Sequence, residues 1–347
     1  MRRICFVIAF FLISLSLSSV HADRGMIPVS PEVSVYEPGQ KAILAWNGYE
    51  EIMILSTDVT SSQETLVLEI LPLPSKPEVE AASFQSFEEI QSLIWEEGVN
   101  QFYSTKTEAR SGSVEVVFYE EIGLHNITVV NAGDASDLVS WMGSFLEGSG
   151  INEEITLRNF ESVVEDYMNR GFRYYVLDMI TVSSAEKSVD PILYRFNSSF
   201  LYYPLVISSP IEGYTEITLF LLTEGKIDRD YWPMQKANYR VLGGGWQPIE
   251  FVLSKGELSK IDLRIGDNFQ HSAWLTVLEF NGYLNSLNRD LMIPGEILNP
   301  DATINVEMTV PLPLIALCIL LGTASTLAGV ITTLLITRWK KKSEKTS

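Results

Sequence analysis

Two carboxylates with one residue between them are the group in this sequence best suited to chemistry. Asp228 and Asp230 stand in a polar, turn-like segment, residues 225–233, and Tyr231 and Trp232 follow them. Alternate residues of a loop can direct two carboxylates to one side, and carboxylate oxygens are ligands that Ca²⁺ prefers. The pair resembles a fragment of a calcium loop but lacks the glycine and the distal glutamate of the full motif. Asp228 and Asp230 are therefore our candidates for a calcium site or a glycosidase-like acid pair, with a solvated turn as the alternative.

Histidine and cysteine offer little further chemistry. His125 and His271 lie in or beside strand patterns, and neither belongs to a metalloprotease-type motif. Cys5 and Cys318 fall in the two strongly apolar segments at the ends of the chain, which leaves none in between. A nucleophile–base triad and a zinc site of the usual ligand set are therefore not expected, and we identify no catalytic residue and no cofactor other than a candidate Ca²⁺.

Other acidic and glycine-rich motifs give no convergent site. Five pairs of adjacent glutamates occur, namely Glu50-Glu51, Glu88-Glu89, Glu96-Glu97, Glu120-Glu121 and Glu153-Glu154. Adjacent side chains point to opposite faces of a strand and lie well apart around a helix, so adjacency does not bring two carboxylates together. Gly243 to Gly245 is followed by Trp246, Gln247 and Pro248, which indicates a flexible turn rather than a phosphate-binding loop.

The apolar pattern predicts the elements that would position these residues. Short runs bounded by turn residues predict strands at 41–46, 51–56, 65–71, 113–121, 123–131, 172–182, 192–196, 200–208, 215–223 and 272–280. Helices are expected at Ser86 to Asn100, from Asp134 through Phe145, and at 156–169, with Ser86 and Asp134 as caps and Gly171 ending the third helix. We expect Asn47-Gly48 to form a hairpin turn and the three prolines at 72–77 to end the third strand. These elements predict an α+β fold with mostly antiparallel sheet.

The aromatic residues mostly sit in apolar runs. We therefore expect them in the core rather than in sugar-stacking platforms; they are Trp46, Trp95, Trp141, Tyr174, Tyr175, Tyr202, Tyr203, Trp232, Trp246 and Trp274.

A long apolar segment near the C-terminus predicts one transmembrane helix at 312–337. From Leu314 to Thr337 a helix would measure ~36 Å, enough to span the ~30 Å hydrocarbon core. The basic tail at 338–347 contains Trp339 and predicts a cytoplasmic C-terminus. Residues 1–22 are typical of a signal peptide cleaved before Asp23. We expect a single-pass type I cell-membrane protein with an extracellular domain at 23–294, a sub-boundary near 184, and a stalk at 295–311.

The membrane segment also carries a face of small residues. Gly322, Ser325 and Gly329 lie near one side of the predicted helix, where small side chains let two helices approach closely. This face predicts self-association or a membrane-protein partner. The ten-residue tail is too short for a signalling domain of its own.

The net charge limits the classes of ligand that the protein can bind. The chain has a formal net charge of −19, which disfavours nucleic acid and anionic lipid as ligands and attracts cations or basic partners. The alternative is that the negative charge is only a solvated acidic surface.

An exported domain of this size without disulfides suggests a prokaryote, and we expect an archaeal source. Asn126 and Asn197 begin sequons and are candidate glycosylation sites.

Several segments resemble a family of exported bacterial and archaeal proteins known only as a domain of unknown function. The resemblance rests on turn, proline and aromatic motifs at 39–48, 53–57, 71–77, 137–141, 167–176 and 191–208. It extends over most of residues 23–223 and implies export and a shared fold. Because no catalytic group is among the motifs, it transfers no activity and no site residues.

These observations predict a membrane-anchored surface protein that is a non-enzymatic binding or envelope component. One alternative is an extracellular, carboxylate-dependent hydrolase, with or without calcium, which would need distant acidic residues to meet in one pocket. The other is an accessory or sensing subunit of a membrane complex, suggested by the small-residue face and the short tail.

Overall fold

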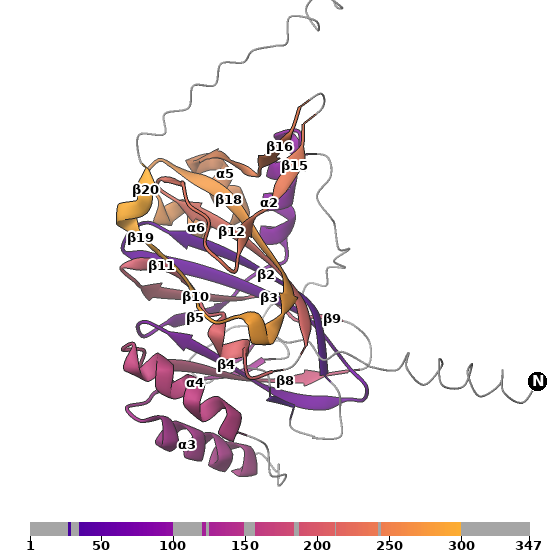
Figure 1. Ribbon diagram of the computed structural model, residues 1–347, viewed down its shortest axis with the longest axis vertical. Helices are drawn as coiled ribbons and strands as arrows, with labels where there is room; N and C mark the ends of the chain where they lie inside the picture. The colour runs from indigo at the N-terminus through magenta and orange to yellow at the C-terminus, as the bar shows by residue number, and fades with distance from the viewer. Residues whose placement is uncertain are drawn as a thin grey trace, which may run out of the picture. The chain divides into compact units, whose positions relative to one another are not determined.

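The computed structural model describes residues 27–28, 35–99, 120–122, 125–148, 157–183, 187–211, 213–241 and 244–299 (Figure 1). The predicted signal peptide and the predicted membrane helix at 312–337 lie outside these ranges. Within them, no helix is both long and apolar enough to cross a membrane.

Two large sheets carry most of the described chain. The smaller has five strands in the spatial order β1 (Ile27–Pro28), β4 (Thr65–Leu73), β8 (Tyr174–Val182), β7 (His125–Asn131) and β6 (Glu120–Ile122). The larger has nine, in the order β14 (Gln235–Lys236), β18 (Ser272–Tyr283), β12 (Tyr214–Thr223), β2 (Val35–Trp46), β3 (Glu50–Ser61), β10 (Ile192–Asn197) and β5 (Glu78–Ala81), with β17 (Glu250–Ser254) beside β18 and β9 (Lys187–Ser188) beside β3. The larger sheet thus takes strands from both sides of residue 184.

Three two-stranded ribbons and five helices complete the described part. The ribbons are β11 (Phe200–Tyr203) with β19 (Leu291–Pro294), β13 (Lys226–Ile227) with β20 (Leu298–Asn299), and β15 (Asn238–Arg240) with β16 (Trp246–Pro248). The helices are α2 (Gln85–Glu96), α3 (Ala135–Gly148), α4 (Arg158–Asn169), α5 (Lys255–Ile261) and α6 (Leu263–Asn268). The named strands pair antiparallel except for β2 with β12. The predicted α+β class is confirmed.

The nine-stranded sheet is covered on both faces. Along β2, Ala42, Leu44 and Trp46 belong to one core, which also contains side chains of the five-stranded sheet, α3 and α4. The alternate residues Ile43 and Ala45 belong to a second core with α2, α5 and α6. Because side chains of a strand alternate between faces, a strand buried on both faces reads as a continuous apolar run. This explains the continuous apolar run from Ala42 to Trp46 in β2.

Three predicted turn and cap residues act as expected. Gly48 has φ +91°, and the Asn47 Oδ1 accepts the backbone N–H of Tyr49 and Glu50 in the β2–β3 turn. Gly171 follows α4 with φ +95°, a conformation that glycine adopts without steric cost. Asp134 caps α3, because its Oδ1 accepts two backbone N–H groups of the first turn.

Other local predictions are wrong. Ser86 is a buried residue inside α2 and not its cap. The strand predicted at 65–71 continues through Pro72, which pairs with Tyr175 of β8. Among the described residues, β1 pairs only with Val67 and Leu68 on the other side of β4, so no described N–H donor is required of Pro72 there.

The predicted strand at 200–208 stops at Tyr203. The backbone N–H groups of Leu205 and Val206 turn to a buried carboxylate, and a 3-10 helix, Val206–Ser208, follows. Helices α5 and α6 were not predicted, although Ser254 and Glu257 form a capping box at the start of α5.

Asp290 joins three segments that are distant in sequence. Its Oδ1 accepts the Tyr167 hydroxyl at 2.8 Å and the backbone N–H of Leu205 and Val206 at 2.8 and 2.9 Å. Its Oδ2 lies 2.7 Å from Nη1 of Arg170, which also lies over the Tyr167 ring. The Asp290 side chain is itself buried, whereas that of Arg170 is half-buried. The carboxylate thereby ties α4 and the 3-10 helix to the segment that enters β19.

The contacts of Asp290 predict that a small substitution at this position causes a large loss of stability. In Asp290→Asn the side chain keeps an acceptor but turns an amide toward Arg170, whose half-buried charge loses its buried partner and keeps only the exposed Asp166. We expect unfolding by urea to show a loss of about 3 kcal/mol. Asp166→Asn removes the exposed partner of the same arginine and should cost less than about 0.5 kcal/mol. Equal losses in the two variants would contradict the role assigned to Asp290.

Glu51 is a second buried carboxyl that joins separate elements. It lies in β3, opposite Trp46 of β2, and its Oε2 accepts the backbone N–H of Tyr202 in β11 at 2.8 Å. Burial raises the pKa of the Glu51 carboxyl well above its ordinary value, against the smaller opposing effect of the Tyr202 hydrogen bond. Between the ordinary pKa of this carboxyl and its raised pKa, the folded protein therefore binds more protons at Glu51 than the unfolded chain does.

This proton gives a pH dependence with a defined sign. Above the ordinary pKa of 4.5 the unfolded chain binds fewer protons at Glu51 than the folded protein does, so the contribution of Glu51 to stability falls as pH rises. We expect the free energy of unfolding of the wild type relative to Glu51→Gln to decrease between pH 4 and 8, by at most about 1.4 kcal/mol per pH unit. Urea titrations across this range measure it. A difference that stays constant with pH would rule out a protonated Glu51.

Candidate functional site

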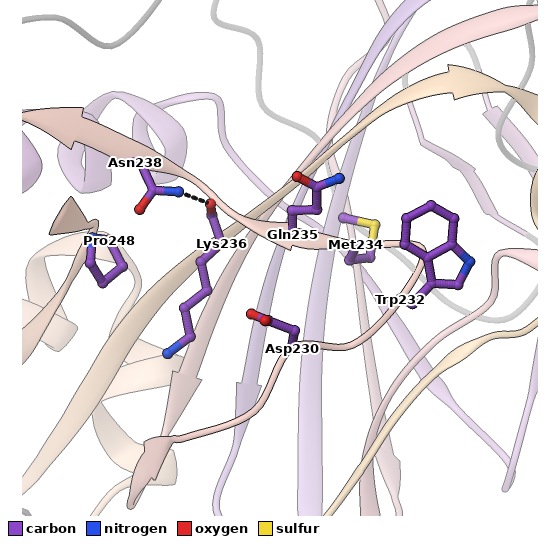
Figure 2. A pocket seen from close by; sticks show the side chains of 7 residues that line it. All are labelled: Asp230, Trp232, Met234, Gln235, Lys236, Asn238 and Pro248. Atoms are coloured by element: carbon purple, nitrogen blue, oxygen red, sulfur yellow. Dashed lines mark hydrogen bonds between the residues drawn. The ribbon is translucent and has the colours of Figure 1, made fainter. Parts of the chain in front are cut away.

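An open hollow of about 460 Å³ lies beside the edge strand of the nine-stranded sheet. The loop after β13 and the strands β14, β15 and β16 supply its lining. We call it the Trp232 hollow; it is lined by Asp230, Trp232, Met234, Gln235, Lys236, Asn238 and Pro248 (Figure 2).

The sheet fixes the positions of these side chains. Gln235 and Lys236 pair with Glu279 and Leu278 of β18, so the middle of the lining belongs to the rigid sheet. Met234 is buried beneath it. Trp232 lies at one end of the hollow and Pro248 at the other in the view of Figure 2.

The ammonium group of Lys236 is already occupied. Its Nζ donates to the carbonyl of Ile227 at 2.6 Å and to Oε2 of Glu250 at 2.8 Å, while Nζ of Lys226 lies 2.7 Å from Oε1 of the same glutamate. Burial alone would raise the pKa of Glu250, but the hydrogen bonds from the two lysines outweigh it and hold that pKa below its ordinary value. Lys236 therefore contributes mainly its aliphatic stem to the hollow.

Three polar groups of the lining face outward. The Asp230 carboxylate is exposed and has no ion-pair partner in the described part of the chain. The Gln235 side chain is exposed as well. Asn238 donates Nδ2 to the Lys236 carbonyl at 2.6 Å, which leaves its amide oxygen for another donor. Beside the Trp232 indole, these groups can hydrogen-bond a polar ligand that also has an apolar face.

The structure separates the two predicted acidic candidates. Asp228 and Asp230 both lie in the exposed loop after β13, but only Asp230 lines the hollow. Among the described residues, no three His, Cys, Asp or Glu side chains form a group suited to a metal ion. The hollow therefore holds one carboxylate where an acid pair would need two.

His125 lies in a buried polar contact away from the hollow. Its Nδ1 is 2.5 Å from Oδ2 of Asp178, and its Nε2 is 2.8 Å from the carbonyl oxygen of Asp190. Catalysis by a His–Asp pair needs the second ring nitrogen to face a nucleophile. Here that nitrogen contacts a backbone carbonyl, so the pair joins β7 and β8 to the segment before β10. His271 is exposed next to β18.

The remaining predicted sites differ in accessibility. Asn197 is exposed at the end of β10, whereas Asn126 is half-buried within β7. Gly322, Ser325 and Gly329 lie outside the described residues.

The exposed tryptophans are the feature that sequence reasoning missed. Trp232 and Trp246 were expected in the core, but their side chains are 62% and 71% exposed. Trp95 and Trp141 are exposed as well, whereas Trp46 is buried as predicted. A signal existed: Trp232 follows a polar loop, and Trp246 follows three glycines rather than standing within an apolar run.

Comparisons with solved structures find distant likenesses. The chain is 11% identical to baculovirus P35 at a TM-score of 0.40, covering 77% of this chain and 99% of that one. A mutated baculovirus P35 after caspase cleavage gives 11% identity and a TM-score of 0.40, with 74% and 99% covered. These values are too low to carry an argument about function. No curated protein matches the chain.

A family model covers more than half of the chain. It matches residues 19–242 and is described as an uncharacterized protein conserved in bacteria (DUF2330). The match confirms the resemblance to a domain of unknown function seen in the sequence, and it includes β14 and β15 of the Trp232 hollow. The chain therefore belongs to the DUF2330 family of uncharacterized bacterial proteins.

Proposed function

We propose that this protein is a non-enzymatic binding component of the cell envelope that takes its ligand at the Trp232 hollow. The exposed Trp232 indole beside the Asp230, Gln235 and Asn238 side chains is the observation that carries the proposal. A large exposed aromatic side chain next to a few polar groups is typical of a recognition surface rather than of inert surface.

The hydrolase alternative has less support. Hydrolysis by carboxylates uses an acid and a base or nucleophile on opposite sides of the scissile bond. The hollow supplies the Asp230 carboxylate alone, and the ammonium of Lys236 is occupied by Glu250. Because the lining can hold a ligand but offers no second reacting group, we favour a binding protein over a hydrolase.

The location is part of the proposal. The signal-like N-terminus, the apolar segment at 312–337 and the basic tail support a type I orientation, in which the domain bearing the hollow is outside the cell. The small residues Gly322, Ser325 and Gly329 suggest that the helix contacts a second helix, from another copy or from a membrane partner.

Cysteine labelling tests the orientation. On a background with Cys5 and Cys318 replaced by serine, Gln63→Cys places a thiol in the exposed β3–β4 turn and Ser343→Cys places one in the tail. We expect a membrane-impermeant maleimide to label the first variant in intact cells and the second only after permeabilisation. Labelling of the tail variant in intact cells would contradict the type I orientation.

Substitution of Trp232 tests the hollow. Full-length protein, purified in a detergent without sugar groups, is applied to an array of immobilised glycans and peptides. We expect Trp232→Ala to weaken binding of the captured ligand by at least about tenfold, a loss of roughly 1.4 kcal/mol. Trp95→Ala, on an exposed tryptophan of α2, is the matched control and should bind as the wild type does. Unchanged binding by Trp232→Ala, or no captured ligand at all, would contradict the proposal.

A further inference from the structure

The β15–β16 hairpin extends the surface of the Trp232 hollow. Asn238 pairs with Pro248 and Arg240 pairs with Trp246 across the two strands. Side chains two residues apart on a strand lie on the same face. Arg240 and Trp246 therefore share the face whose first pair, Asn238 and Pro248, already lines the hollow.

The extended surface has an exposed indole at each end. Trp232 lies at the end of the hollow away from Pro248 (Figure 2). Trp246 stands two residues from Pro248 on β16, where it pairs with Arg240. From Gln235 to Arg240 the extended backbone advances by about 17 Å. The exposed side chains between the two indoles, Gln235 and Asn238 among them, are polar, so the surface is a strip with aromatic ends and a hydrogen-bonding middle.

The strip suits a chain of sugars better than a peptide or a nucleic acid. A sugar ring has a face of C–H groups that can lie on an indole and a rim of hydroxyls that can reach carboxylate and amide groups. Peptide anchors usually fill buried apolar pockets, whereas the exposed part of this lining is mainly polar and the apolar Met234 is buried. The net charge of −19 disfavours a polyanion.

We infer that the strip from Trp232 to Trp246 binds an extended, uncharged oligosaccharide chain, with one ring on each indole and the hydroxyls between them on Asp230, Gln235 and Asn238. This inference rests on the proposed binding function and names its ligand class. A ligand that spans both indoles must gain affinity with chain length, and the gain must depend on Trp246.

Calorimetry with cello-, chito- and manno-oligosaccharides of one to six units tests this, with full-length protein in a detergent without sugar groups. For the series that binds, we expect the affinity of the wild type to rise at least tenfold from the shortest to the longest member. Trp246→Ala should abolish that rise and leave the shortest ligands unaffected, while Trp232→Ala should weaken all of them. Trp95→Ala should match the wild type, and equal unfolding midpoints would show that the variants fold.

Two results would overturn the inference. One is the absence of binding by every series, and the other is binding whose length dependence survives in Trp246→Ala. The proposed function would still stand if a peptide on the array bound in a Trp232-dependent manner. Failure of both measurements would remove the hollow as a binding site.

Discussion

Burial of the nine-stranded sheet on both faces is the constraint on which the rest of the structure depends. The same strands supply alternate side chains to two cores, one with the five-stranded sheet and one with α2, α5 and α6. A strand in such a position cannot tolerate a polar side chain on either face without a partner. In the described part of the chain, the edge of the sheet is not covered in this way, and there β14 and the loop before it can expose Trp232, Asp230 and Gln235.

Three sets of buried polar groups lie where separate segments meet. Asp290 joins α4 to the chain on either side of the β11–β19 ribbon, Glu51 joins β3 to β11, and His125 with Asp178 joins the five-stranded sheet to the segment before β10. In each case protein atoms replace water as hydrogen-bond partners. A different packing of these segments would therefore leave a buried polar group without that hydrogen bond. We suggest that these contacts specify how the layers assemble in a chain whose two cysteines lie near its ends.

Local chemistry could be predicted from the sequence, and long-range partners could not. Asn47-Gly48, Asp134 and Gly171 act through backbone atoms a few residues away, and all three were predicted correctly. The end of β11 depends on Asp290, which lies 85 residues from Leu205 and gives no local signal. The exposure of Trp232 and Trp246 depends on which strand forms the sheet edge. Asp230 was identified from its spacing to Asp228, but its neighbours in the hollow come from β14, β15 and β16.

Fluorine NMR of the full-length protein, with all seven tryptophans replaced by 5-fluorotryptophan, tests most directly whether the Trp232 hollow binds a ligand. Single tryptophan-to-phenylalanine variants assign the resonances, and soluble polysaccharide extracted from a prokaryotic cell envelope is the titrant. Binding at the hollow predicts that the Trp232 resonance shifts or broadens first, while those of buried Trp46 and of Trp95 on α2 stay unchanged. Resonance changes confined to Trp95 or Trp141, or no change in any resonance at saturating polysaccharide, would contradict binding at the Trp232 hollow.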